Sequence, residues 1–356
     1  MKEKSLSPSL KRNDPQKLFF EALWERMELY TAISAYNRAL DDISSYHKKA
    51  AEYGDDSKVA WGLLGLGNTN FRAGNVKKAE EYTLKALSLA SRKEYRKVIL
   101  TCWNGLGNIC GFRGDHSKAF QYFKKILDSR EGPGPDAATL YNNIAVLHLH
   151  MNDISCAEEY IQKAIQASLK IKDLFSETRS RIHLAIIRIK QGNMKEAEEQ
   201  ALRSLKLAEK AMYLQKIPMC LNTLGFILKT RGKYRKALHN FKRSYALNLD
   251  NQNLYGQSTN LLNIAEVYLL LGESGPAFEY FKKAGAITDV TGDPAGKVQA
   301  LYGMGEACRA MKDRKKAAAY YRQALKVSNL HKSLPYPGKA KERLAEMKIE
   351  KNKKNI

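Results

Sequence analysis

The chain has 356 residues, 44% of them hydrophobic and 27% charged, which is ordinary for a folded soluble protein. Its formal net charge of +23 favours acidic partners, although lysines that only solvate outward helix faces would also explain the excess. No apolar run approaches the roughly 18 residues of a membrane-spanning helix, and the basic N-terminus lacks the apolar core of a secretory signal. We therefore expect a cytoplasmic protein without a transmembrane segment, whose five scattered cysteines are reduced thiols.

The first 59 residues are the least regular part of the chain. Residues 1–15 are polar and basic and are predicted to form a disordered N-terminus. Residues 16–59 predict either a degenerate first repeat of the pattern that follows or N-terminal helices, of which one would be a longer helix over Gln16–Tyr53. As a repeat, the segment would have a first helix over Leu18–Arg26, a turn at Met27 and a second helix. That second helix would place an alanine, an aromatic residue and an alanine on one face: Ala32, Tyr36 and Ala39.

Residues 60–330 carry a pattern with a period of 40 residues, interrupted by one interval of 38. Each unit contains a turn residue: Gly74, Gly114, Asn152, Gly192, Gly232, Gly272 and Lys312. Five residues after each turn comes an alanine: Ala79, Ala119, Ala157, Ala197, Ala237, Ala277 and Ala317. Seven residues before each turn comes a small residue: Gly67, Gly107, Ala145, Ala185, Gly225, Ala265 and Gly305. A repeat of this size predicts a solenoid, in which each unit buries its apolar face only against its neighbours.

Within one unit the pattern predicts two helices. Leu63, Leu66, Gly67 and Asn70 follow at spacings of three to four, which is typical of a helix stripe. A glycine such as Gly74 can take the left-handed conformation that closes the last helical turn. The small residue before each turn would let the two helices of a pair approach closely.

These motifs resemble the tetratricopeptide repeat family over about Ala60–Val327. The resemblance implies an all-α, right-handed α-solenoid of antiparallel helix pairs, with seven clear repeats and a degenerate N-terminal one. The family standard is about 34 residues, so the helices or the connections of this chain should be longer. After the array, residues 338–356 are predicted to form a capping helix and a basic tail.

The sequence offers no arrangement that favours catalysis or a cofactor. Motifs for metalloprotease, phosphate-binding-loop, serine-hydrolase and zinc-finger chemistry are missing from the sequence. The histidines are scattered, and His148 and His150 point to different sides of a helix because they are two residues apart. We therefore expect no enzyme activity, no metal and no cofactor.

The family resemblance implies that the first helices line an inner groove, and asparagines recur at its inward positions. A side-chain amide has both donors and acceptors, so it can pair with a peptide backbone whatever its sequence. The candidate peptide-binding residues are Asn68, Asn104, Asn108, Asn142, Asn143, Arg179, His183, Asn222 and Asn263. A subset resembles the family's clamp for a C-terminal carboxylate: Asn104, Asn108, Asn143, Arg179 and His183. The clamp is incomplete, because Asn104 and His183 stand where cations are usual.

The expected function is that of a non-enzymatic scaffold or adaptor, which binds a peptide or helix of a partner protein with acidic character. One alternative is a peptide-sensing regulator of the bacterial type that the 40-residue period resembles. Another is an RNA-binding solenoid that uses the basic surface. The oligomeric state stays undetermined.

Overall fold

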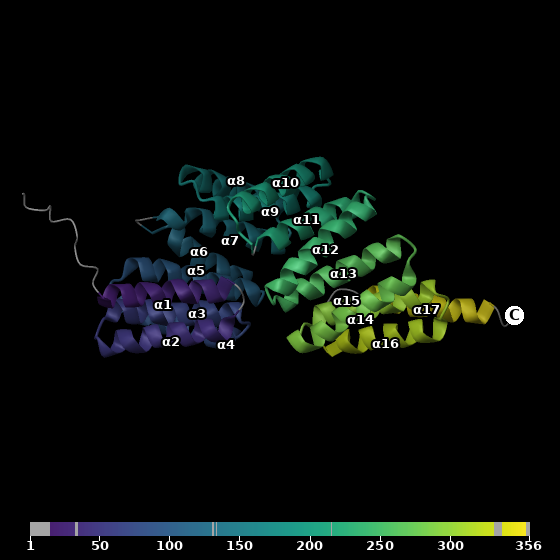
Figure 1. Ribbon diagram of the computed structural model, residues 1–356, viewed down its shortest axis with the longest axis horizontal. Helices are drawn as coiled ribbons and strands as arrows, with labels where there is room; N and C mark the ends of the chain where they lie inside the picture. Colours follow the sequence, from purple (N-terminus) through teal and green to yellow (C-terminus); the bar gives the residue numbers. More distant parts are fainter. Residues whose placement is uncertain are drawn as a thin grey trace, which may run out of the picture. The chain divides into compact units, whose positions relative to one another are not determined.

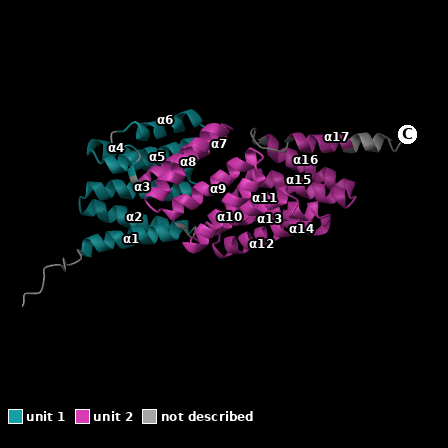
Figure 2. Cartoon of the chain, turned by 90° about the horizontal axis from the view of Figure 1, so that it is seen from above, with its two compact units in different colours: residues 1–134 teal, residues 135–356 magenta. Residues whose placement is uncertain are grey.

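The computed structural model describes residues 15–32, 35–129, 132, 134–214, 216–330 and 337–353. The predicted disordered N-terminus, apart from its last residue, and residues 354–356 of the predicted basic tail lie outside the described residues. The described chain forms two compact units, residues 1–134 and 135–356 (Figure 2).

All regular structure in the described residues is helical (Figure 1). Unit 1 contains α1 (Pro15–Ala32), α2 (Tyr36–Glu52), α3 (Asp56–Arg72), α4 (Val76–Arg92), α5 (Arg96–Phe112) and α6 (His116–Leu127). The short 3-10 helix η1 (Gly134–Asp136) follows, and unit 2 begins with α7 (Ala137–His150), α8 (Ile154–Lys170), α9 (Leu174–Lys190), α10 (Met194–Lys210), α11 (Ile217–Thr230) and α12 (Tyr234–Asp250). It ends with α13 (Leu254–Leu270), α14 (Ser274–Thr291), α15 (Pro294–Ala310), α16 (Arg314–Leu330) and α17 (Pro337–Lys353).

The period of 40 residues follows from the length of the helices. For example, α3 and α4 each have 17 residues, and the short connection 73–75 joins them. The extra residues relative to the usual repeat of about 34 therefore extend the helices and leave the connections short. Longer helices give each repeat a wider surface on both sides of the array.

The predicted turn residues have the backbone conformation that the pattern required. All seven have positive φ, from 59° at Asn152 to 84° at Gly74 and Gly114. A second series of left-handed residues, which the sequence pattern did not predict, lies between consecutive repeats: Gly54, Glu94, Lys172, Met212, Gln252 and Gly292. The helix pairs α3–α4, α7–α8, α9–α10, α11–α12 and α13–α14 thus each have a left-handed residue in their internal turn and another after their second helix.

The small residue of the first helix faces the large residue of the second helix. A Cβ added to Gly225 would lie 2.6 Å from Cε1 of Phe241, and one added to Gly305 would lie 2.5 Å from Cε1 of Tyr321. Phe241 and Tyr321 are both fully buried. The ring fills the space that the missing side chain leaves, so the two helix backbones can pack closely.

The N-terminal segment forms a helix pair, but its phase differs from the predicted one. Helix α1 continues through Met27, where a turn was expected, and ends at Ala32. The buried face of α2 is formed by Ala39, Ile43 and Tyr46. The predicted face began at Ala32, whereas the buried face of α2 begins at Ala39, so the phase of the predicted repeat was wrong by seven residues.

The last described helix covers the end of unit 2. Helix α17 packs on α16, and Ala340 is buried there. Arg343 donates from Nε to Oε1 of Glu306 at 3.1 Å, which ties α17 to α15. None of the described helices is both long enough and apolar enough to cross a membrane.

Candidate functional site

The packing of unit 2 defines which helices lie on its inner side. The first helices of neighbouring repeats pack on each other, α7 on α9, α9 on α11, α11 on α13 and α13 on α15. The second helices α8, α10, α12, α14 and α16 make no comparable packing with one another in the described part of the chain. Helices that touch in successive repeats lie on the inside of a curve, so α7, α9, α11, α13 and α15 form the inner surface of unit 2.

A hydrogen-bonded group of polar side chains joins α7 to α9. Asn142 is 1% exposed, and its Nδ2 atom donates to Oγ of Ser180. Its Oδ1 atom lies 2.5 Å from Nδ1 of His183. Because an amide oxygen only accepts hydrogen bonds, Nδ1 of His183 carries the proton and Nε2 carries the lone pair. Asn142 is thus buried between two repeats and is not available to a ligand, contrary to the expectation from the sequence.

The charged groups around His183 are cations. Burial, and then the positive charges of Arg179 and Lys216, together lower the pKa of His183 to about 3. His183 is therefore neutral at pH 7, while Arg179 on α9 and Lys216, directly before α11, keep their positive charges. Glu177, the one acidic residue of α9, is paired with Arg181 at 2.8 Å. Arg179 and Lys216 thus place two cations beside His183 at this end of the inner surface.

A stripe of side chains continues from this positive end along α11. Lys216, Met219, Asn222 and Phe226 follow at spacings of three, three and four residues, so they share one side of the helix. Met219 is 36% exposed and Phe226 is 39% exposed. Large apolar side chains exposed on an inner surface are available to contact a ligand.

The asparagines of α11 and α13 form a second polar group. Oδ1 of Asn222 accepts from Nδ2 of Asn263 at 2.9 Å and from Nδ2 of Asn260 at 3.2 Å. These bonds leave the donor Nδ2 of Asn222 and the acceptor Oδ1 of Asn263, both on half-buried residues. The pair offers one donor and one acceptor to a peptide backbone.

Farther along the inner surface, the charges are paired. Nζ of Lys229 donates to Oε2 of Glu266 at 2.6 Å, and Nε2 of Gln299 donates to Oε1 of the same carboxylate at 2.8 Å. One carboxylate, that of Glu266, thus accepts from a side chain of α11 and from a side chain of α15.

The remaining predicted residues are divided between the units. Asn68 is exposed on α3, and Asn104 and Asn108 are half-buried on α5, all in unit 1. Asn143 is half-buried on α7 in unit 2. The clamp-like set predicted from the sequence thus draws residues from two separately packed units. Sequence reasoning missed Lys216, which lies directly before α11. It also missed Met219 and Phe226, although their spacing from Asn222 along α11 was a detectable signal.

The geometry defines a helical-repeat protein with a polar and apolar inner surface. Family models described as tetratricopeptide repeat match residues 58–132, 138–170 and 256–329, which together are just over half of the chain. The chain belongs to the tetratricopeptide repeat family.

Several solved structures share this fold at low sequence identity. The protein PH0952 from Pyrococcus horikoshii, a signal transduction ATPase with numerous domains and a tetratricopeptide repeat sensor, is 17% identical with a TM-score of 0.65. That match covers 90% of this chain, which spans 50% of PH0952. A Rap protein complexed with competence and sporulation factor is 12% identical with a TM-score of 0.61, over 93% of this chain and 98% of that protein. Yeast Tom70 is 14% identical with a TM-score of 0.56, over 99% of this chain and 68% of Tom70. No curated protein sequence matches the chain.

Proposed function

We propose that the protein is a non-enzymatic adaptor that binds a peptide segment of a partner protein on the inner surface of unit 2. The observation that carries this proposal is the stripe on α11, where the cation Lys216 is followed by Met219, Asn222 and Phe226 on one side of the helix. Along this line, the cation could contact an acidic group of an extended peptide, the amide its backbone, and the two apolar side chains a large apolar residue. Peptide sites commonly combine backbone hydrogen bonds with contacts to alternate side chains.

The same groups indicate which peptide would bind. Arg179 and Lys216 favour an acidic side chain or a terminal carboxylate, and a guanidinium can bind a carboxylate through two parallel hydrogen bonds. Asn222 and Asn263 would pair with the peptide backbone. Met219 and Phe226 would contact a large apolar side chain.

A random peptide library selected against the full chain tests this proposal. The enriched peptides should share an acidic group and a large apolar residue, separated by a short stretch of any sequence. Each lost hydrogen bond is worth about 0.5–1.5 kcal/mol, so Asn222→Ala should weaken binding about 2- to 13-fold. Arg179→Gln should weaken it at least as much, because its bond is charged.

Lys282, which is exposed on α14, provides the matched control. Lys282→Gln removes one positive charge from an outward helix and should leave the peptide affinity unchanged. Equal affinities of the Asn222→Ala, Arg179→Gln and Lys282→Gln variants would show that the peptide binds on another surface.

A second candidate partner is nucleic acid, which the charge of α16 favours. This helix contains five lysines and arginines and no acidic residue: Arg314, Lys315, Lys316, Arg322 and Lys326. By contrast, the cations of α10 are balanced by an equal number of glutamates. Binding of a labelled single-stranded RNA should then weaken steeply with salt, and the triple variant Lys315→Glu, Lys316→Glu, Arg322→Glu should abolish it. If the triple variant keeps the affinity, α16 is not an RNA surface.

A further inference from the structure

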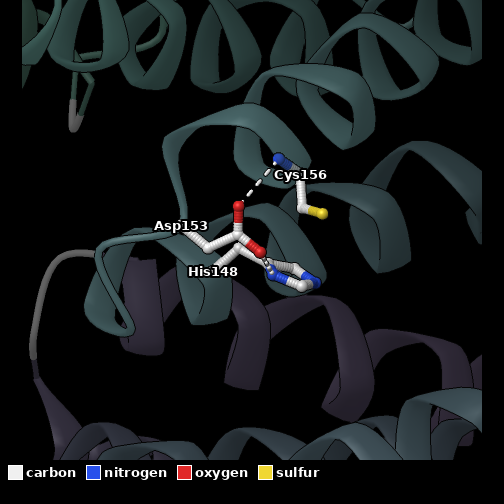
Figure 3. Close-up of side chains that lie close together, drawn as sticks. All are labelled: His148, Asp153 and Cys156. Atoms are coloured by element: carbon white, nitrogen blue, oxygen red, sulfur yellow. Dashed lines mark hydrogen bonds and ion pairs between the residues drawn. The ribbon is translucent and has the colours of Figure 1, made fainter.

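Three side chains of types that ligate metals converge at the turn between α7 and α8 (Figure 3). His148 lies in the last turn of α7, Asp153 is the N-cap of α8, and Cys156 follows three residues later. One ligand atom of each lies within 4.8 Å of the others. His148 is largely buried, whereas Asp153 is 40% exposed. The cluster is therefore buried on the side of His148 and open to solvent on the side of Asp153.

Part of this arrangement is common to the repeats. An N-cap side chain that crosses the turn also occurs in the first regular repeat, where Nδ2 of Asn75 donates to Oδ1 of Asn70 at 3.3 Å. The equivalent positions in the adjacent repeats hold other combinations: Cys110, Asp115 and Lys118 before it, and Arg188, Asn193 and Glu196 after it. Capping explains Asp153, but it does not explain a histidine and a cysteine on either side of its carboxylate.

The carboxylate of Asp153 can serve both purposes at once. Its Oδ1 atom accepts from the backbone N–H of Cys156 at 3.1 Å, which caps α8. Its Oδ2 atom lies 3.1 Å from Nδ1 of His148. In a tetrahedral site with bonds of about 2.0–2.3 Å, ligand atoms are separated by roughly 3.3–3.7 Å. An ion between Oδ2, Nδ1 and the sulfur would therefore require only small side-chain movements.

We propose that His148, Asp153 and Cys156 bind a divalent ion of the zinc class, with the fourth position open to solvent or to a partner's side chain. Thiolate and imidazole select zinc and cobalt over magnesium and calcium, which prefer oxygen ligands. On binding, the thiol of Cys156 loses its proton to solvent, and the imidazole proton resides on Nε2 so that Nδ1 can donate its lone pair to the ion. The ring of His148 is held by Tyr160, whose ring stacks on it at 5.7 Å and 12°.

A cobalt titration of the chelator-treated, reduced full chain tests the site directly. Cobalt stands in for zinc and gives an absorption band when a thiolate ligates it. We expect one cobalt ion per chain with a thiolate band, and we expect added zinc to displace it. Zinc should also raise the melting temperature, because it binds the folded state alone.

Three variants make the test specific. Cys156→Ser should remove the thiolate band. Asp153→Asn keeps an N-cap of equal quality but loses the carboxylate ligand, so the metal-free protein should melt as before while its cobalt affinity falls at least about tenfold. His150→Gln is the control, because His150 is exposed two residues away from His148 and outside the cluster.

Two outcomes would overturn the proposal. One is a wild-type chain that gives no thiolate band with cobalt. The other is a band or an affinity that stays unchanged in Cys156→Ser and Asp153→Asn, which would place the ion at another site. The melting temperature of metal-free Asp153→Asn separates loss of the ligand from loss of the fold.

Discussion

Nδ1 of His183 donates a hydrogen bond to Oδ1 of Asn142 across 2.5 Å, and this bond joins the first helices of two consecutive repeats. The two residues are 41 positions apart, close to one period of the array. Both were candidates for ligand contact on the evidence of the sequence. In the structure the pair links α7 to α9.

Replacing Asn142 should therefore cost stability. Asn142→Ala leaves the Ser180 hydroxyl and the Nδ1–H of His183 without this partner in a buried environment, which costs about 1–3 kcal/mol. Asn68→Ala, at an exposed position of α3, should stay within about 0.5 kcal/mol of the wild type. Urea unfolding followed by circular dichroism compares the two. Equal midpoints would show that the buried amide contributes nothing to the repeat interface.

Stability should fall at acidic pH because of His183. Its pKa is lowered from the ordinary 6.5 to about 3 in the folded protein. Between these values the unfolded chain binds a proton that the folded chain does not bind, so the contribution is present above pH 6.5 and is lost progressively as the pH falls towards 3.

The control for this effect is His183→Gln, which keeps a side-chain donor near Asn142 but cannot titrate. The difference in melting temperature between wild type and His183→Gln, measured from pH 7.5 to pH 4, should change steadily in favour of the variant as the pH falls. A pH-independent difference would contradict the lowered pKa.

A bulky residue at the close helix contact should damage the array. Gly225→Leu would place its side chain against the ring of Phe241, and overpacking of this kind costs about 1–3 kcal/mol or more. Lys233→Ala, at the exposed start of α12, should change stability by no more than about 0.5 kcal/mol. Differential scanning calorimetry of both variants checks the prediction, which fails if they melt together.

The left-handed residues between repeats predict a stabilising substitution. Met212 has φ of 51° and is 80% exposed, so its side chain gains little from packing while its backbone pays the left-handed penalty of about 1–2 kcal/mol. Met212→Gly should raise stability by about 0.5–1 kcal/mol after the greater chain entropy of glycine is subtracted. Gly272→Ala, with φ of 79° at the other turn, should lower stability by about 1 kcal/mol. A destabilising Met212→Gly would show that the side chain has a role in the fold.

The regular repeats could be predicted from sequence because the turn and packing residues recur in phase. The first helix pair shows the limit of this method. Ala32, Tyr36 and Ala39 have the same four-and-three spacing as the buried Ala39, Ile43 and Tyr46, seven residues further on. Seven residues are close to two helical turns, so both sets would share one face of a continuous helix and the spacing alone cannot distinguish them. In the structure Ala32 ends α1, whereas Ala39, Ile43 and Tyr46 lie on α2.

The candidate site was less predictable for a different reason. Whether an inward asparagine meets a ligand or a neighbouring repeat depends on contacts between residues about 40 positions apart, as with Asn222 and Asn263. Lys216 was missed because it lies in a connection, outside the helix pattern. The cluster of His148, Asp153 and Cys156 was missed because its residues lie on two helices, and the spacing of five and three residues brings them together only across the turn.

The regular spacing of the turns makes the array modular at the level of the gene. Removal of residues 193–232 would join Gly192 directly to Lys233, the residue that occupies the place of Asn193 one period later. Every following side chain would keep its partner one repeat ahead, and the shortened chain would have one fewer step in its ladder of helices. Unequal recombination between neighbouring repeats could thus lengthen or shorten such a chain while the contacts between consecutive repeats are kept.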